Sequence, residues 1–192
     1  MRHTIAAVVA SILLVAPLAA GDAPYQRAQY RHWITSTAKA CWTVRTEVLV
    51  RDAHAVQFRD AAGCTIAAGR WVDPYTGAVL TDPKRLDVDH LVPLQHAHAH
   101  GGAAWPPEKK RQYANDVSYP RHLLAVGAAA NRQKGAKGPD AWRPAAREFW
   151  CEYATAWAVV KFRYELSASA AERAAVDAML ATCRPVGGGS DD

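Results

Sequence analysis

A short run in the middle of the chain combines residue types that could support metal-dependent hydrolysis. Asp89 and His90 are adjacent, and His122 and Asn131 follow at intervals. A carboxylate and an amide oxygen are hard ligands that suit Mg²⁺, which binds one or two carboxylates and keeps several waters. A neutral histidine beside them can accept a proton from the attacking water, while the metal stabilises charge on a phosphate. We therefore expect a divalent-metal site here, with Mg²⁺ as the first candidate and Mn²⁺ as another.

The segment that follows carries an excess of positive charge. From residue 131 to residue 147, five basic residues stand against one acid, Asp140. The basic residues are Arg132, Lys134, Lys137, Arg143 and Arg147. Such a one-sided charge balance is more typical of a surface that binds a polyanion than of an ordinary solvent-facing surface. We expect Arg132, Lys134 and Lys137 to contact the phosphates of a nucleic-acid substrate.

Two short strands and one helix are predicted to position these side chains. The run Leu86–Leu94 is strand-like but has charges where a strand should carry apolar residues, which marks it as a candidate site. Alternation places Asp87 and Asp89 on one face of this strand and His90 on the other, unless the backbone bends. The second strand and the helix are predicted at His122–Val126 and Ala128–Lys134.

The remaining patterns are weaker. Gln26–Ala40 predicts a helix or an arm. Branched and aromatic residues at near-alternating positions of Cys41–Ile66, which include Val44 and Val48, predict a short β region. A turn is predicted at Trp71–Gly77, and helices are predicted at Glu108–Asn115, Trp142–Tyr164 and Ser169–Leu180.

Three spaced strings resemble those of a known nuclease family. They are Asp-Val-Asp-His-Leu-Val-Pro-Leu from Asp87, Leu-Leu-Ala-Val from Leu123, and Asn-Arg-Gln-Lys-Gly from Asn131. In this order they resemble the HNH endonucleases, also called His-Me finger or ββα-metal endonucleases. The resemblance is to the secreted branch related to the C-terminal nuclease domain of GmrSD-type restriction enzymes, and it runs from about Cys41 to Cys183.

This resemblance implies a fold, an activity and residue roles. The fold is α+β, with a ββα-metal core, a short N-terminal β region and additional C-terminal helices. The activity is hydrolysis of phosphodiester bonds in nucleic acid, with DNA as the first candidate, RNA as the second, and little sequence preference. By this resemblance His90 is the general base, and Asp89 and Asn131 are the metal ligands. His122 stands where this branch usually has Asn, and it would either orient His90 or approach the metal.

Other functions stay open on the sequence alone. An exported basic protein could capture nucleic acid without cleaving it. His96, His98 and His100 alternate along an alanine-rich stretch, and on a helix His96 and His100 would align. They could form a zinc site with Asp89, form a zinc hydrolase with His90, or belong to an exposed linker.

The N-terminal residues predict export. Arg2 precedes an apolar run from Ile5 to Ala20 that closes with small residues, which is typical of a secretory signal peptide cleaved near Ala20 or Gly21. An uncleaved membrane anchor is the alternative. Cleavage would leave 22 basic residues (23 minus Arg2) against 18 acids, so the net charge falls from +5 to +4. We expect a signal peptide at 1–20, an arm or helix at 21–40, a nuclease domain at 41–184 and a flexible tail at 185–192.

The composition and the cysteines agree with an exported globular domain. A chain with 50% hydrophobic and 21% charged residues is neither disordered nor a polytopic membrane protein. The four cysteines form no C-x-x-C pair, which favours two disulfides over a zinc knuckle or a redox motif. Three connectivities are possible. We favour Cys41–Cys64 with Cys151–Cys183, because each bond then ties one end of the domain.

Overall fold

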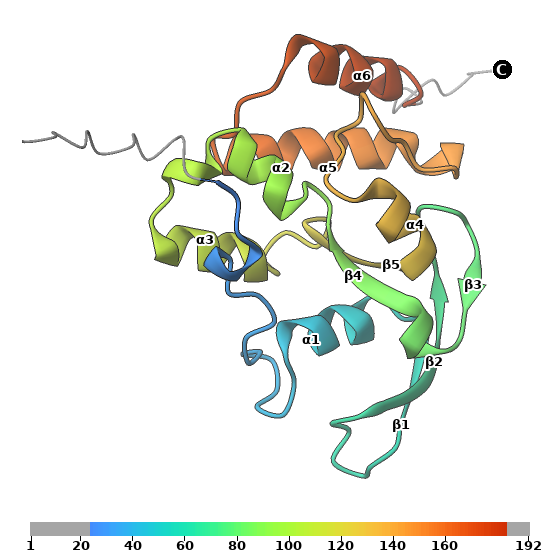
Figure 1. Ribbon diagram of the computed structural model, residues 1–192. Coiled ribbons are helices and arrows are strands. Elements are labelled where there is room, and N and C mark those ends of the chain that lie inside the picture. The colour runs from blue at the N-terminus through green and yellow to red at the C-terminus, as the bar shows by residue number, and fades with distance from the viewer. Residues whose placement is uncertain (1–23, 184–192) are drawn as a thin grey trace, which may run out of the picture.

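The computed structural model describes residues 24–183 and shows a mixed α and β fold (Figure 1). The expected signal peptide and C-terminal tail lie outside these residues. At the centre, strand β4 (Leu86–His90) pairs antiparallel with strand β5 (Leu123–Gly127), and helix α4 (Ala128–Lys134) follows β5 without a loop. The predicted α+β class is confirmed, and these three elements lie where the sequence predicts them.

The two faces of the β4–β5 pair contact different apolar clusters. On one face, Val88 joins the cluster around helix α1 (Val44–Arg51). On the other face, Leu124 and Val126 join a larger cluster that includes helix α5 (Trp150–Arg163). Strand β5 is apolar on both faces because both are covered. Strand β4 instead places its two acids on the face shared with Leu124 and Val126.

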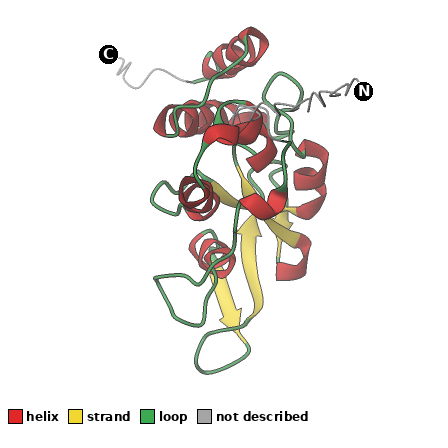
Figure 2. Ribbon diagram, turned by 60° about the vertical axis from the view of Figure 1, so that its left-hand side comes forward, coloured by secondary structure: helices red, strands yellow, loops and turns green. Residues whose placement is uncertain are grey.

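A second antiparallel sheet extends away from the helices (Figure 2). Its strands are β1 (Ala55–Phe58), β2 (Ile66–Val72) and β3 (Val79–Leu80), in that order. A β region is therefore present, but the prediction that it includes Val44 and Val48 is wrong, because these residues belong to α1. The Thr43 side chain caps this helix by accepting the N–H of Thr46 at 3.3 Å, and the two valines, one turn apart, are buried on one face.

The stretch between β4 and β5 folds into two short helices. Helix α2 (Leu94–Ala99) occupies the histidine-containing stretch for which the sequence left a linker or a helix open. Helix α3 (Pro107–Asn115) confirms the helix predicted at Glu108–Asn115. Its first turn contains Pro107, whose missing N–H has no helical partner at that position. This insertion therefore begins and ends at the strands that carry the candidate site.

The C-terminal part forms two packed helices, α5 and α6 (Ala170–Leu180). The prediction of α6 is confirmed, and the Ser169 side chain caps it by accepting a backbone N–H of the first turn at 3.0 Å. The predicted start of α5 at Trp142 is wrong, since the helix begins at Trp150. Pro144 lacks an N–H and disfavours helical backbone before it, and its carbonyl accepts the indole N–H of Trp150 at 2.8 Å.

Two disulfides tie the ends of the described chain. Cys41–Cys64 and Cys151–Cys183 have Cα atoms 5.7 and 4.9 Å apart, so the favoured pairing is confirmed. Residues 26–40 form an arm rather than a helix, with a 3₁₀ turn at Arg27–Gln29. Asn115, the last residue of α3, accepts the N–H of Ile34 at 3.2 Å and so fixes this arm. Within residues 24–183, no helix has the length and apolar character needed to cross a bilayer.

Candidate active site

Strand β4 and helix α4 are joined by two polar contacts. Asn131 donates from Nδ2 to Oδ2 of Asp87 at 3.1 Å. Lys134 donates from Nζ to Oδ2 of Asp89 at 2.6 Å. Residues two apart on a strand share a face at a spacing of about 6.6 Å, and residues three apart on a helix share a face at about 5–6 Å. The spacing of the two acids on β4 therefore matches that of Asn131 and Lys134 on α4. Both acids of β4 therefore point toward α4, as the alternation predicts.

Lys134 holds Asp89 from inside the protein. Its side chain is fully buried, and its ammonium also donates to the carbonyl of His90 at 3.0 Å. Burial lowers the pKa of Lys134, and the adjacent Asp89 carboxylate opposes this shift. The Tyr75 hydroxyl donates to the same Asp89 oxygen at 2.6 Å. The expectation that Lys134 contacts phosphate is corrected by its burial, because this lysine positions Asp89 instead.

The geometry around His90 fixes which ring nitrogen can act as a base. Its Nε2 lies 3.0 Å from the carbonyl oxygen of Ala114. A carbonyl only accepts hydrogen bonds, so Nε2 carries the proton and Nδ1 carries the lone pair. Trp33 stacks on the ring, with centroids 5.4 Å apart and an interplanar angle of 25°. Burial, reinforced by nearby His122, lowers the pKa of His90 well below its usual range, which keeps the ring neutral.

His122 does not line the pocket that contains His90. It is completely buried, and its Nε2 donates to the carbonyl of Tyr113 at 2.7 Å. Burial lowers its pKa to about 4. The last carbonyls of a helix have no partner within the helix, and α3 presents those of Tyr113 and Ala114 to His122 and His90, respectively. His122 therefore does not approach the expected metal ligands in this pocket, which corrects that role. Orientation of His90 by His122 stays a prediction.

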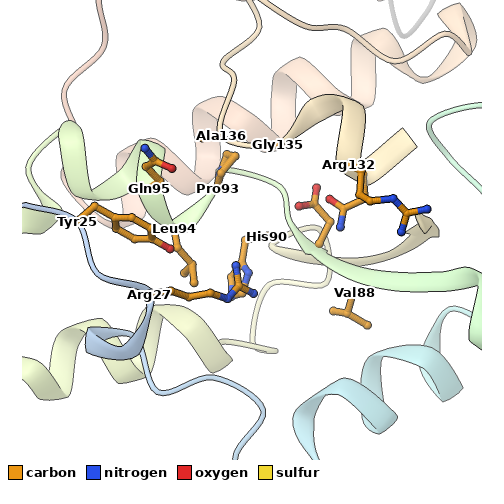
Figure 3. Close-up of a pocket in the computed structure, with 12 residues that line it drawn as sticks. Tyr25, Arg27, Val88, His90, Pro93, Leu94, Gln95, Arg132, Gly135 and Ala136 are labelled. Atoms are coloured by element: carbon orange, nitrogen blue, oxygen red, sulfur yellow. The ribbon is translucent and has the colours of Figure 1, made fainter. Parts of the chain in front are cut away.

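The expected metal ligands lie in one pocket. Asp89, His90 and Asn131 line a cavity of about 350 Å³. Figure 3 shows His90 in this pocket. Tyr75 and Lys134 both bind Oδ2 of Asp89, so Oδ1 remains as the oxygen that can ligate a metal. The amide nitrogen of Asn131 faces a carboxylate, which leaves its amide oxygen as a second hard ligand. These two oxygens fit the ligand preference of Mg²⁺, which binds one or two carboxylates and keeps several waters.

Two arginines supply positive charge at this pocket. Arg132 lines it from α4, and Arg27 extends from the N-terminal arm toward His90 (Figure 3). Arg132 thus lies where the sequence predicts a phosphate contact. Lys137 is exposed but does not line the pocket, and its ammonium donates to a backbone carbonyl of α4 at 2.7 Å. Arg27 is not predicted from the sequence, because the arm has no periodicity that would link it to β4.

The histidines of α2 lie at a different place. His96 and His100 are aligned, as a helix predicts, with ring centroids 4.0 Å apart. Among residues 24–183, the side chain that completes a possible metal-ligand group with them is Glu172 of α6, and neither Asp89 nor His90 belongs to this group. Nδ1 of His98 instead lies 3.3 Å from the hydroxyl of Tyr30 in the arm. This finding corrects both zinc arrangements that the sequence left open, the site with Asp89 and the hydrolase with His90.

The fold and the site define a disulfide-bonded α+β protein with a polar pocket between a strand and a helix. No protein-family model matches the chain, and no solved structure matches it. An uncharacterized secreted protein of Arthroderma benhamiae is 40% identical over 159 residues, which cover 83% of this chain and 76% of that protein. The chain belongs to the family of this secreted protein. The predicted secretion is confirmed, and the two disulfides are compatible with it.

Proposed function

We propose that this secreted protein is a metal-dependent endonuclease that hydrolyses phosphodiester bonds, with DNA as its main substrate. One observation carries the proposal. The hydrogen bond from His90 to the Ala114 carbonyl leaves Nδ1 unprotonated, and this histidine lines the same pocket as Asp89 and Asn131. The order β4, β5, α4 is the order that a ββα-metal core would require, and the resemblance to HNH endonucleases supports the same assignment.

Each residue then has one task. Asp89, through Oδ1, and Asn131, through its amide oxygen, would hold a divalent ion. When bound, such an ion polarises the phosphodiester and stabilises charge on the leaving oxygen. His90 accepts a proton from the attacking water at Nδ1, while the Ala114 carbonyl keeps the ring in place and stabilises the imidazolium N–H. Lys134 keeps the Asp89 carboxylate in position by its 2.6 Å contact.

The cations at the pocket indicate the substrate class. Arg27 and Arg132 can pair with phosphate oxygens in a bidentate manner. Phosphate contacts fix the position of a nucleic acid but do not read its bases, so little sequence preference is expected. DNA and RNA share this backbone charge, which makes RNA the second candidate substrate.

Digestion of plasmid DNA tests the proposal. Mg²⁺ or Mn²⁺ should support cleavage, and EDTA should stop it. His90→Ala should reduce turnover by about 10²–10⁴-fold, the range typical of a general base. His54→Ala is the matched control, because His54 is exposed and lies before β1, outside the pocket. A folded, metal-loaded protein that leaves DNA and RNA intact would rule the nuclease out.

The alternative is an exported basic protein that binds nucleic acid without cleaving it. The basic residues at the pocket would serve either function. Binding measured in EDTA, and again in Asn131→Ala, separates the two. Undiminished binding together with no cleavage under any divalent ion would favour the alternative.

A further inference from the structure

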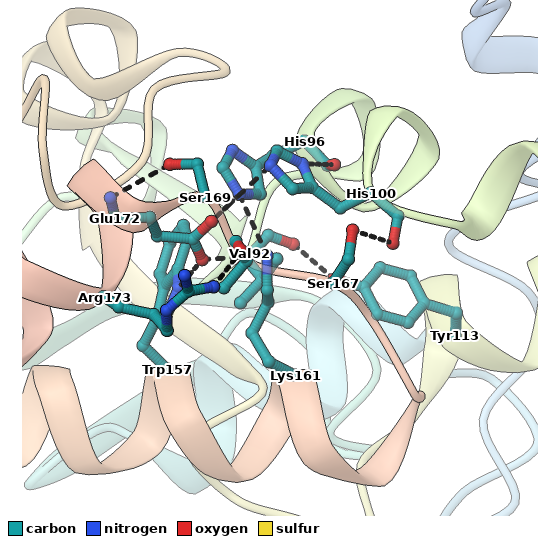
Figure 4. A network of polar contacts seen from close by, with 11 residues as sticks. Val92, His96, His100, Tyr113, Trp157, Lys161, Ser167, Ser169, Glu172 and Arg173 are labelled. Carbon is teal, nitrogen blue, oxygen red and sulfur yellow. Dashed lines mark hydrogen bonds and ion pairs between the residues drawn. The ribbon is translucent and has the colours of Figure 1, made fainter.

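His96 of α2 and His100, which directly follows this helix, point their Nε2 atoms at one carboxylate of α6 (Figure 4). His96 and His100 are one turn apart, and their rings stack with an interplanar angle of 13°. Nδ1 of His100 lies 2.8 Å from the carbonyl of His96, so the proton of the neutral ring is on Nδ1. The lone pair of its Nε2 therefore faces the carboxylate of Glu172. Because the imidazole nitrogen and the carboxylate both present lone pairs, a cation between them would stabilise this arrangement.

The carboxylate of Glu172 has one satisfied oxygen and one unsatisfied oxygen. The residue is 1% exposed. Its Oε1 accepts the indole N–H of Trp157 at 2.7 Å and the ammonium of Lys161 at 2.8 Å. Its Oε2 is buried and has no hydrogen-bond partner among the described residues. Burying such an acceptor without a partner costs about 1–3 kcal/mol.

The distances around Oε2 fit metal coordination better than hydrogen bonding. Oε2 lies 3.4 Å from Nε2 of His96 and 3.5 Å from Nε2 of His100, and neither contact meets hydrogen-bond criteria. Nitrogen and oxygen ligands lie about 2.0–2.2 Å from Zn²⁺ in a tetrahedral shell, which sets them about 3.4 Å from one another. All three ligand atoms lie within 4.8 Å of one another, so a small rotation of the imidazoles would complete the arrangement.

We infer that His96, His100 and Glu172 form a binding site for a divalent transition metal, of which zinc is the best match. Two imidazoles and one carboxylate are a donor set that zinc prefers, with water as a fourth ligand. The hydrogen bond from His100 to a backbone carbonyl is the outer contact that usually orients a zinc-binding histidine. This site is separate from the proposed nuclease pocket and does not depend on that proposal.

Lys161 is the competing cation at this site. Its ammonium lies 3.3 Å from Nε2 of His96 as well as beside Oε1 of Glu172. A metal on Oε2 would leave the contact with Oε1 in place and displace the ammonium only from His96. The metal would then join α6 to α2, and Leu94 and Gln95 at the start of α2 line the proposed active site. The bound ion would therefore brace one wall of that pocket from the C-terminal helix.

Zinc titration of the full secreted protein tests the inference. After treatment with EDTA, the protein should bind one zinc ion per chain, measured by mass spectrometry of the metal after desalting, and its melting temperature should rise with zinc. His100→Ala should weaken zinc binding by at least about tenfold. His100 is the more exposed of the two histidines, and circular dichroism would verify that this variant folds. If it does not fold, His100→Gln takes its place.

Two control variants define the site. His54→Ala removes an exposed histidine elsewhere and should keep wild-type zinc affinity. Asn131→Ala alters the proposed nuclease pocket and should also keep it, so zinc in the two places can be told apart. The inference is overturned if the wild-type protein retains no zinc, if His100→Ala binds zinc as tightly as the wild type, or if Asn131→Ala abolishes binding.

Discussion

Lys134 of α4 and Asp89 of β4 form an ion pair with 2.6 Å between the ammonium nitrogen and Oδ2, and the lysine has no exposed surface. Moving these charges out of water costs several kcal/mol per ion, and their attraction offsets this only while both partners are present. The pair therefore makes the position of Asp89 depend on the packing of α4. It links the stability of the fold to the geometry of the pocket.

Removing the lysine charge should destabilise the protein strongly. In Lys134→Met the Asp89 carboxylate stays buried without its partner, and the free energy of unfolding should fall by about 3–5 kcal/mol in urea denaturation. Lys109→Met is the matched control, because Lys109 pairs with Glu165 near the surface at 3.2 Å, where such pairs contribute about 0–1 kcal/mol. Adding Asp89→Asn to Lys134→Met should recover part of the loss. Equal small effects in the two lysine variants would contradict a structural ion pair.

Stability should also fall as the pH drops below about 6.5. The pKa of His122 is about 4 in the folded protein, whereas an unfolded histidine titrates near 6.5. Between these values the unfolded chain binds the extra proton, so the folded state loses up to about 3 kcal/mol, and above them this contribution is constant. Denaturation midpoints measured across this range test the slope. His122→Gln keeps a donor for the Tyr113 carbonyl without titrating, and an unchanged slope in this variant would exclude His122 as the cause.

The two disulfides should contribute similar stability. They join residues 23 and 32 positions apart, for which the chain-entropy model gives about 3–4 kcal/mol each, with a difference of only about 0.3 kcal/mol. Melting temperatures of the two double variants, Cys41→Ala with Cys64→Ala and Cys151→Ala with Cys183→Ala, test this. A large difference between them would show that strain or residual structure in the unfolded chain outweighs loop entropy.

Arg132 should affect nucleic-acid binding through charge alone. If it contacts one phosphate, Arg132→Ala should lower affinity for all sequences and reduce the slope of log affinity against log salt by about 1. Filter binding with a catalytically inactive His90→Ala background gives this slope. Arg173→Ala is the control, because Arg173 is an exposed arginine of α6 outside the pocket and should leave the slope unchanged.

The local elements of the site are predictable from the sequence. Alternation and apolar runs place β4, β5 and α4, and they place both acids of β4 on one face. The contacts that orient His90 are not local. Ala114 lies 24 residues further along the chain, at the end of α3, and Trp33 belongs to the arm. No periodic pattern links such distant segments, so only the folded packing reveals them.

The remaining differences between the sequence predictions and the structure depend on how the side chains are buried and packed. Lys134 stands in a basic segment and therefore resembles a phosphate ligand, but its position one turn after Asn131 turns it toward β4. The valines of α1 suit a strand as well as a helix, and the spacing of four between Val44 and Val48, preceded by Thr43 as a cap, was the helical signal. Glu172 follows the Ser169 cap by three residues, a spacing that predicts the first turn of α6. This spacing does not predict the contact of Glu172 with His96 and His100, which depends on how the helices pack.

The pocket gathers side chains from Tyr25 to Ala136, and the ring of His90 is held by a carbonyl from the insertion between β4 and β5. Contacts of such long sequence separation form only after the intervening loops have closed. A chain that is still emerging, or a fragment released from one end, contains the same residues without their arrangement. Any activity of this pocket is therefore acquired only when folding is complete.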